Sequence, residues 1–264
     1  MIGAGVGAAI AGARPITEIL YIDFAMLGMD QIVNQAAKFR LMTGDRGSVP
    51  FVMRTQGGAG GAVAAQHSQS LEALFYHIPG LRVVMPSTPY DAKGLLTHSL
   101  RQDHPVMFLE HKHLYMTKGM VPEEDYEIEF GKAEVMTEGD DVTIVAWSHM
   151  LLKAMEAAET LAAENIRAEV INLRTLSPLD TDTIMTSVAK TNRVVIAQEA
   201  VRRGGVASDI ASYIQEEEFY SLDAPIEIVA GLNIPIPFNL TLEKASVPQA
   251  DDIVAAAKRT LEHA

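Results

Sequence analysis

Short apolar runs alternate with longer amphipathic segments along the first half of the chain. The runs have the length of strands, and the segments between them repeat apolar positions with the period of a helix. The pattern predicts strands at 16–22, 50–54, 82–85 and 106–110, and helices at 29–40, 70–76 and 90–101. Such alternation is typical of a mostly parallel sheet with helices on both faces.

The alternation restarts after a polar, acidic stretch. We interpret residues 117–130 as an exposed linker between two domains at 1–116 and 131–264. The second domain is predicted to hold strands at 142–147, 168–172, 193–197 and 226–229, and helices at 151–163, 181–189, 205–217 and 251–263. The fold class is therefore α/β, with two parallel-sheet α/β domains.

Composition narrows the possible partners. A length of 264 residues suits two domains, and a net charge of −13 argues against binding to nucleic acid or to anionic membranes. The chain has no cysteine, which excludes disulfides and thiolate metal sites. Residues 1–13 are rich in glycine and alanine, too short to span a bilayer and unlike a signal peptide. We expect a cytoplasmic protein.

The first residues imitate a dinucleotide-binding motif. Gly3 to Ala8 fit the pattern G-x-G-x-x-A, and Asp23 lies near the spacing of a ribose-binding acid. The motif requires a strand directly before its first glycine, and no such strand precedes Gly3 in this sequence. We interpret the segment as a helix of small residues packed closely against another helix or subunit.

A glycine-rich loop leads to His67. Its glycines are Gly57, Gly58, Gly60 and Gly61. Glycine permits sharp turns and close approach, so the loop is expected to form around a ligand or another chain. Ser68 and Ser70 are predicted to cap a helix with Glu72 in its first turn, which favours a neutral His67 that exchanges protons near pH 7. The alternative is a structural loop whose histidine bonds its own backbone.

Two other patterns suggest chemistry less strongly. His111 and His113 have the spacing of neighbours on one strand face, but no carboxylate or cysteine of metal-ligand spacing accompanies them, and Glu110 points to the opposite face. Residues 202–205 precede a predicted helix and suit either an anion or a subunit contact, of which we favour the contact.

Several long blocks carry a family resemblance. They lie at 7–19, 30–40, 64–96, 105–115, 170–180 and 235–243, and include AAQHSQSLEALFYHIPGL and PVMFLEHKHLY. The chain resembles the β subunit of the decarboxylating component of 2-oxo acid dehydrogenase complexes, the family of pyruvate, branched-chain and acetoin dehydrogenases. The resemblance implies a transketolase-like pyrimidine-binding domain followed by a transketolase C-terminal-like domain.

The resemblance also implies a cofactor, partners and site residues. In that family thiamine diphosphate lies between an α subunit, which holds the diphosphate and magnesium, and a β subunit, which receives the aminopyrimidine ring. The subunits form an α2β2 heterotetramer that docks on a lipoyl acyltransferase core. His67 matches the active-site histidine, implicated in proton transfer and in handing the acyl group to lipoamide. Phe24 matches the aromatic residue packed on the pyrimidine, and Leu20 lines the same pocket.

Two departures from the family pattern matter. The family's catalytic glutamate lies in an I-S-E-x-G block that falls just upstream of Met1, so we expect this sequence alone to activate thiamine diphosphate poorly. Members of the family often bind potassium at backbone oxygens around Phe51, Ser99 and Leu100; here Gln102 and His104 replace the usual oxygen-rich side chains, which leaves the potassium site open.

Two functions from different classes follow. The first is an enzyme subunit that decarboxylates a 2-oxo acid, or cleaves acetoin, and passes the acyl group to lipoamide. The second is a non-catalytic scaffold or regulatory subunit. The histidine and Phe24 favour the first, and the upstream position of the family glutamate favours the second. The sequence leaves the identity of the substrate open, because the α chain forms part of the substrate pocket. The sequence of the glycine-rich loop and of the block that follows it is most similar to acetoin and pyruvate members.

Overall fold

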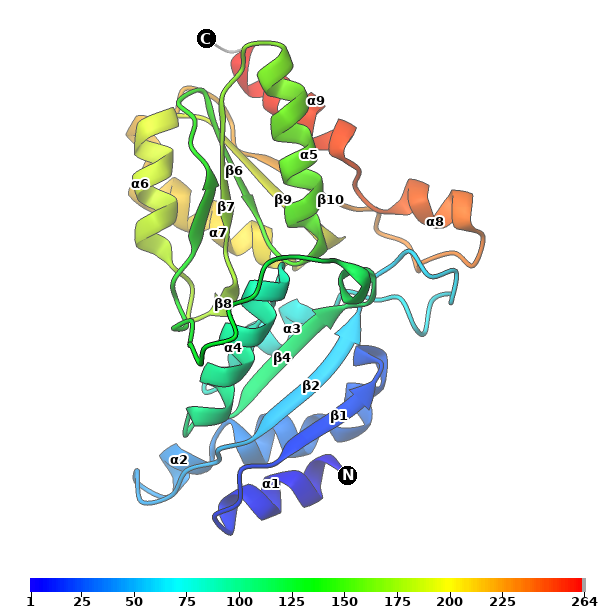
Figure 1. The fold of residues 1–264 in the computed structure, drawn as a ribbon, viewed down its shortest axis with the longest axis vertical. Coiled ribbons are helices and arrows are strands. Elements are labelled where there is room, and N and C mark those ends of the chain that lie inside the picture. Colours follow the sequence, from blue (N-terminus) through cyan, green and yellow to red (C-terminus); the bar gives the residue numbers. More distant parts are fainter. Residues whose placement is uncertain (263–264) are drawn as a thin grey trace.

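The computed structural model describes residues 1–262 as two α/β units, each built around one sheet (Figure 1). The first sheet has the order β1-β2-β4-β3-β8, formed by Ile16–Leu20, Val52–Gly57, Val106–His111, Arg82–Val84 and Thr175–Ser177. The second has the order β10-β9-β6-β7-β5, formed by Glu227–Gly231, Val194–Val201, Val142–Ala146, Ala168–Asn172 and Glu134–Thr137. In each sheet the strands pair in parallel except the last, which is antiparallel. The predicted α/β fold is confirmed.

The helices of the first unit are less regular than expected. They are α1, α2, α3 and α4, at Ile2–Ile10, Phe39–Met42, Glu72–Tyr76 and Pro89–Arg101, with 3₁₀ turns η1 and η3 at Ile22–Gly28 and Lys112–Met116. The single helix predicted at 29–40 is wrong, because a π-helix, η2, covers Gln31–Ala36 before α2 begins. Gly28 touches Ile2 of α1 closely, and the wide turn keeps Ile32 and Ala36 buried.

The second unit follows its hydrophobic pattern closely. Its helices are α5, α6, α7, α8 and α9, at His149–Ala163, Thr181–Thr191, Val206–Glu217, Leu240–Ser246 and Ala250–Leu261, with a 3₁₀ turn η4 at Phe219–Ser221. Every residue of β6 and β7 is buried, as expected for parallel strands covered on both faces. The sequence did not predict α8, β5 or β8, and the predicted helix end at 263 lies outside the described residues.

The N-terminal segment is a packing helix. Helix α1 begins at Ile2, and a Cβ added at Gly5 would lie 2.9 Å from the ring of Phe51, below any normal contact. A Cβ at Gly3 would lie 3.2 Å from Gln31 of η2. The prediction of a small-residue helix packed against another helix is therefore confirmed, since glycine is needed where α1 approaches its neighbours.

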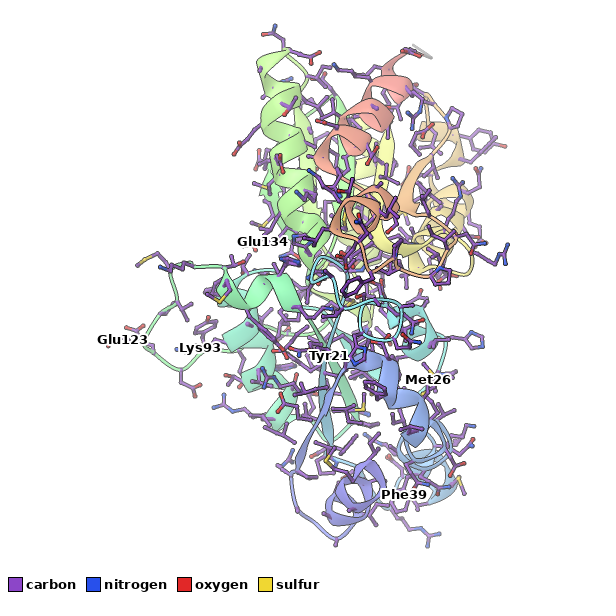
Figure 2. All side chains as sticks on the ribbon, turned by 90° about the vertical axis from the view of Figure 1, so that its right-hand side faces the viewer. Tyr21, Met26, Phe39, Lys93, Glu123 and Glu134 are labelled. Carbon is purple, nitrogen blue, oxygen red and sulfur yellow. The ribbon has the colours of Figure 1, made fainter. Side chains whose placement is uncertain are left out.

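The segment between the units is not a free linker. Lys93 of α4 donates to the carbonyl oxygens of Glu123 and Glu124, at 3.2 and 2.8 Å, and Figure 2 shows Lys93 beside this outer loop. The Tyr126 ring stacks on Tyr90 with centroids 4.6 Å apart, and Ile128 is buried. Most of the stretch is exposed as expected, but Tyr126 and Ile128, between the acidic residues, pack on α4.

A buried polar group joins the two units. The Arg174 guanidinium, from the turn between β7 and β8, donates to Asp91 of α4 at 2.7 Å, and Asn172 donates to the same carboxylate at 2.9 Å. Both charged side chains are almost fully enclosed; Arg174 also pairs with Glu134 at 2.5 Å, whereas Asp91 depends on Arg174 for its charge balance. Within residues 1–262, the helices are too short or too polar to cross a lipid bilayer.

Candidate active site

The glycines of the His67 loop are required by two histidines of the first unit. We call residues 58–70, between β2 and α3, the histidine loop. Gly58 and Gly60 have φ angles of +88° and +102°, a region that favours glycine. A Cβ at Gly58 would lie 2.0 Å from Nε2 of His111, and one at Gly60 would lie 1.9 Å from Nε2 of His113. The loop therefore lies directly on these imidazoles.

His67 lies in this loop and not at a helix terminus. Helix α3 begins at Glu72, its N-cap is Leu71, and no side chain caps it. The predicted capping by Ser68 and Ser70 is wrong: Ser70 donates to Glu199 at 2.9 Å, and the buried Ser68 hydroxyl has no partner among the described residues. Long-range contacts of the loop replace the local capping that the serine pattern indicated.

Aromatic rings enclose the imidazole of His67. The Tyr21 ring lies 5.3 Å from it at an interplanar angle of 73°, and the Phe24 ring lies 5.3 Å from it at 78°. The structure therefore brings together two of the residues that the resemblance selected, His67 and Phe24, and adds Tyr21. Figure 2 shows Tyr21 and Met26 along η1, the segment that follows β1.

The surface beside these rings is apolar and exposed. Leu20, at the end of β1, is 57% exposed, Phe24 is 36% exposed and Leu27 is 90% exposed. Exposed apolar side chains that follow one another closely in the chain are typical of a segment that binds a ligand or another protein. Leu20 and Phe24 are both accessible from outside.

The first unit holds the middle of the histidine loop. Lys112 Nζ donates to the backbone oxygen of His67 and lies 5.2 Å from the centre of the Tyr21 ring. Gln69 donates to Asp23 at 2.7 Å, and the second oxygen of this buried carboxylate has no partner among the described residues. Burial lowers the pKa of Lys112 from its ordinary value. Sequence analysis missed Lys112, Asp23 and Gln69 as site residues, although Gln69 lies in the HSQS block.

The second unit holds both ends of the loop through two carboxylates. Glu199 of β9 accepts from the Ala59 N–H at 2.8 Å and from Ser70 at 2.9 Å. Glu243 of α8 accepts from the N–H groups of Gly60 and Ala62 at 2.8 and 2.9 Å. Both glutamates were missed, and no local signal in the sequence pairs them with the loop.

Glu199 also bonds an imidazole. His111 Nε2 lies 2.9 Å from Glu199, and His111 Nδ1 accepts from the N–H of His113 at 3.2 Å. Because Nδ1 accepts and Nε2 donates, the His111 ring is neutral, and burial lowers its pKa in the same direction. Burial opposes ionisation of Glu199, but the hydrogen bonds from His111 and from the Ala59 N–H hold the pKa of this carboxyl well below its usual range.

The same residues have the composition of a metal site. His111, His149 and Glu199 place one ligand atom each within 4.8 Å of one another, so the expectation that His111 lacks a carboxylate partner is wrong. Glu110 does point elsewhere, since it pairs with Arg54. A metal on His111 Nε2 requires a proton on Nδ1, which faces the His113 N–H and accepts from it. The hydrogen bonds therefore favour a metal-free Glu–His pair.

The remaining candidates find protein partners. The backbone oxygens of Phe51, Ser99 and Leu100 accept hydrogen bonds from Val106, Gln102 and Arg14, respectively. At the start of α7, the Ala207 N–H donates to the side chain of Gln198 at 2.9 Å, which takes up one donor expected to face an anion. Each carbonyl keeps a second lone pair, so the potassium site stays a prediction, whereas the start of α7 loses one donor to Gln198.

The comparisons with known proteins agree with this architecture. Residues 1–118 match the family described as "Transketolase, pyrimidine binding domain", and residues 131–253 match "Transketolase, C-terminal domain". A solved structure titled "Split gene transketolase, inactive beta4 tetramer" superposes with a TM-score of 0.82 at 27% identity, over 99% of this chain and 80% of that one. The fold is therefore that of the transketolase-type domain pair.

Curated relatives narrow the class. The chain is 51% identical to the acetoin:2,6-dichlorophenolindophenol oxidoreductase subunit beta of Cupriavidus necator, over 99% of this chain and 77% of the relative. It is 48% identical to the pyruvate dehydrogenase E1 component subunit beta of Rickettsia felis, over 97% and 79%. It is 43% identical to the 2-oxoisovalerate dehydrogenase subunit beta of Bacillus subtilis, over 98% and 80%. The chain belongs to the family of β subunits of thiamine-diphosphate-dependent 2-oxo acid and acetoin dehydrogenases, which confirms the resemblance.

Proposed function

We propose that this chain is the β subunit of an oxidoreductase that decarboxylates a 2-oxo acid, or cleaves acetoin, and transfers the acyl group to lipoamide. The observation that carries the proposal is the enclosure of His67 by Tyr21 and Phe24 beside an exposed apolar face. The family membership gives the reaction class. The domain limits 1–116 and 131–264, with 117–130 between them, are part of the proposal.

The described residues fit the aminopyrimidine ring of thiamine diphosphate. Phe24 and Leu20 offer an apolar surface for a flat ring, and the free oxygen of buried Asp23 is an acceptor for an amino group. When bound, thiamine diphosphate supplies the nucleophilic carbon that attacks the substrate carbonyl. His67 then holds or moves a proton as the acyl group passes to lipoamide, and the apolar walls exclude water.

The partners follow from the family. An α subunit holds the diphosphate and magnesium, two α and two β chains form the heterotetramer, and a lipoyl acyltransferase core receives the acyl group. Potassium at the backbone oxygens of Phe51, Ser99 and Leu100 stays part of the proposal, because each carbonyl keeps a second lone pair beside the one that accepts a hydrogen bond.

The deciding experiment co-expresses this chain with its genomic α neighbour. Reduction of 2,6-dichlorophenolindophenol is measured with thiamine diphosphate and with acetoin, pyruvate or 2-oxoisovalerate as substrate. Cofactor-dependent turnover with one of them supports the proposal that the chain is an enzyme subunit and identifies its substrate. A stable complex without turnover supports the scaffold alternative instead.

The role of His67 is tested separately. We expect His67→Ala to lower acyl transfer to lipoamide by about 10²-fold or more, as for loss of a proton-transfer group, while α–β assembly is retained. The matched control is His77→Ala, because His77 is exposed and lies in the turn after α3. Normal acyl transfer by the His67 variant would rule out the assigned role.

A further inference from the structure

The histidine loop is fixed from two sides. Its centre is held by the first unit, through Lys112 and Asp23, whereas its ends are held by the second unit, through Glu199 and Glu243. We infer that Glu199 and Glu243 are positioning residues for His67, so that the geometry of the active histidine depends on the docking of the two units. This inference rests on the proposed role of His67.

The two glutamates are suited to this task by charge and burial. Glu243 is 1% exposed, and each of its oxygens accepts one loop N–H. Glu199 receives donors from the loop on one oxygen and from His111 on the other. A carboxylate accepts at both oxygens, whereas an amide would direct its own N–H groups at these donors. An anion is therefore required at both positions.

The loop backbone bound by the two glutamates has N–H groups that need acceptors from outside the loop. Gly60 and Ala62 both adopt positive φ angles, and the loop forms no helix or strand between β2 and α3. N–H groups in such a segment have no secondary-structure partner, so an outside acceptor must satisfy them. Each glutamate does this from an element of the second sheet unit, β9 or α8, and fixes the path that the chain takes toward His67.

A helix of the second unit is thereby linked to the active histidine. Positioning of a catalytic group within about 1 Å changes rates by about 10²-fold, so a loosened loop should reduce the step that needs His67. Acyl transfer to lipoamide is that step, whereas reduction of the dye acceptor needs only the cofactor chemistry before it. A difference between the two assays therefore separates positioning from general damage.

The test compares Glu243→Gln with Glu159→Gln in the complete α–β complex. Glu159 lies on the exposed face of α5 and provides the same chemical change away from the loop. We expect the Glu243 variant to lose acyl transfer by about tenfold or more, while dye reduction changes by less than about threefold. The acyl-transfer rate of Glu243→Asp should lie between those of the wild type and the glutamine variant, because aspartate keeps the charge but is shorter.

Hydrogen exchange gives a readout that needs no turnover. Amide exchange of the loop peptide should accelerate by about tenfold in Glu243→Gln, because one loop N–H loses its acceptor, and should be unchanged in Glu159→Gln. Ser70→Ala is the substitute if Glu243→Gln folds poorly. It removes a Glu199 contact from the loop side and should also accelerate amide exchange of the loop. Equal losses in both assays, or unchanged loop exchange, would overturn the inference. Absence of turnover in the wild type would refute the proposed function and leave the exchange test intact.

Discussion

The two units of this chain divide their work differently. In the first unit, β1 leads into 3₁₀ and π turns, and the residues around His67 lie on irregular backbone. In the second unit, long helices cover fully buried strands, and its contributions to the site, Glu199 and Glu243, come from a strand and a helix. The comparison shows that reactive side chains lie on adaptable segments, while regular elements supply fixed anchors.

The largest predicted effect concerns the connection between the units. Arg174→Met should destabilise the chain by about 3–5 kcal/mol, because Asp91 would be left as an uncompensated buried charge. Urea unfolding measures it. The control is Arg167→Met, whose surface pair with Asp140 should contribute less than about 1 kcal/mol. Similar losses in both variants would mean that the buried pair is not the connection that we infer.

The next prediction concerns pH. Burial and the charge of Glu199 raise the pKa of Glu72 from 4.5 to about 7. The folded state thus binds a proton more tightly than the unfolded state, so stability falls as pH rises from about 4.5 to 7 and is then level. Glu72→Gln removes this loss and should stabilise the protein at pH 8 by up to about 3 kcal/mol, with no gain near pH 4.

Thermal unfolding across this pH range tests the sign. Glu159→Gln again serves as the control, because an exposed glutamate has no comparable burial. A variant at Glu72 that follows the wild-type pH curve would show that this carboxyl does not carry the effect. Glu72 belongs to the first unit but contacts the second, where Trp147 Nε1 donates to it at 3.4 Å. That result would mean that the second unit does not control the ionisation of this first-unit side chain.

The smallest predicted effect is that of a substitution at Phe24, which should change the affinity for thiamine diphosphate more than the stability of the fold. Phe24→Ala should weaken thiamine diphosphate binding by about tenfold through loss of ring contact, with little change in stability because Phe24 is on an open face. Phe75→Ala, in the buried core of α3, should instead cost about 3–5 kcal/mol of stability. Calorimetric titration of the complex and thermal unfolding give the two readings. A large stability loss at Phe24 would identify it as a core residue.

Much of the fold could be predicted from sequence, and the reasons are physical. The strand at 142–147 is apolar except for Thr143 and lies between turn residues, so burial on both faces left few alternatives. The segment at 29–40 repeats apolar residues like a helix, but packing against α1 imposes a π-helix that such periodicity does not encode. Tertiary contact thus overrode local pattern where the backbone is irregular.

The candidate site shows the same division. His67 could be identified because it lies in a recognisable block of residues, and Phe24 through the family resemblance. Glu243 closes the block 235–243, but nothing local connects it or Glu199 with Gly60 and Ala59, from which they are separated by 183 and 140 positions. One sequence reveals which residues have reactive groups, whereas their distant supports become visible only in the folded chain.

The edge strand β8 has a practical consequence for dissecting this protein. Thr175–Ser177 lies beyond β7 in the chain, yet it completes the first sheet by pairing with β3. Cleavage near residue 125 would therefore expose a bare hydrogen-bonding edge on β3, and such edges recruit other strands. A fragment that ends at the apparent boundary is expected to aggregate, so isolated halves are poor substitutes for the intact subunit in binding studies.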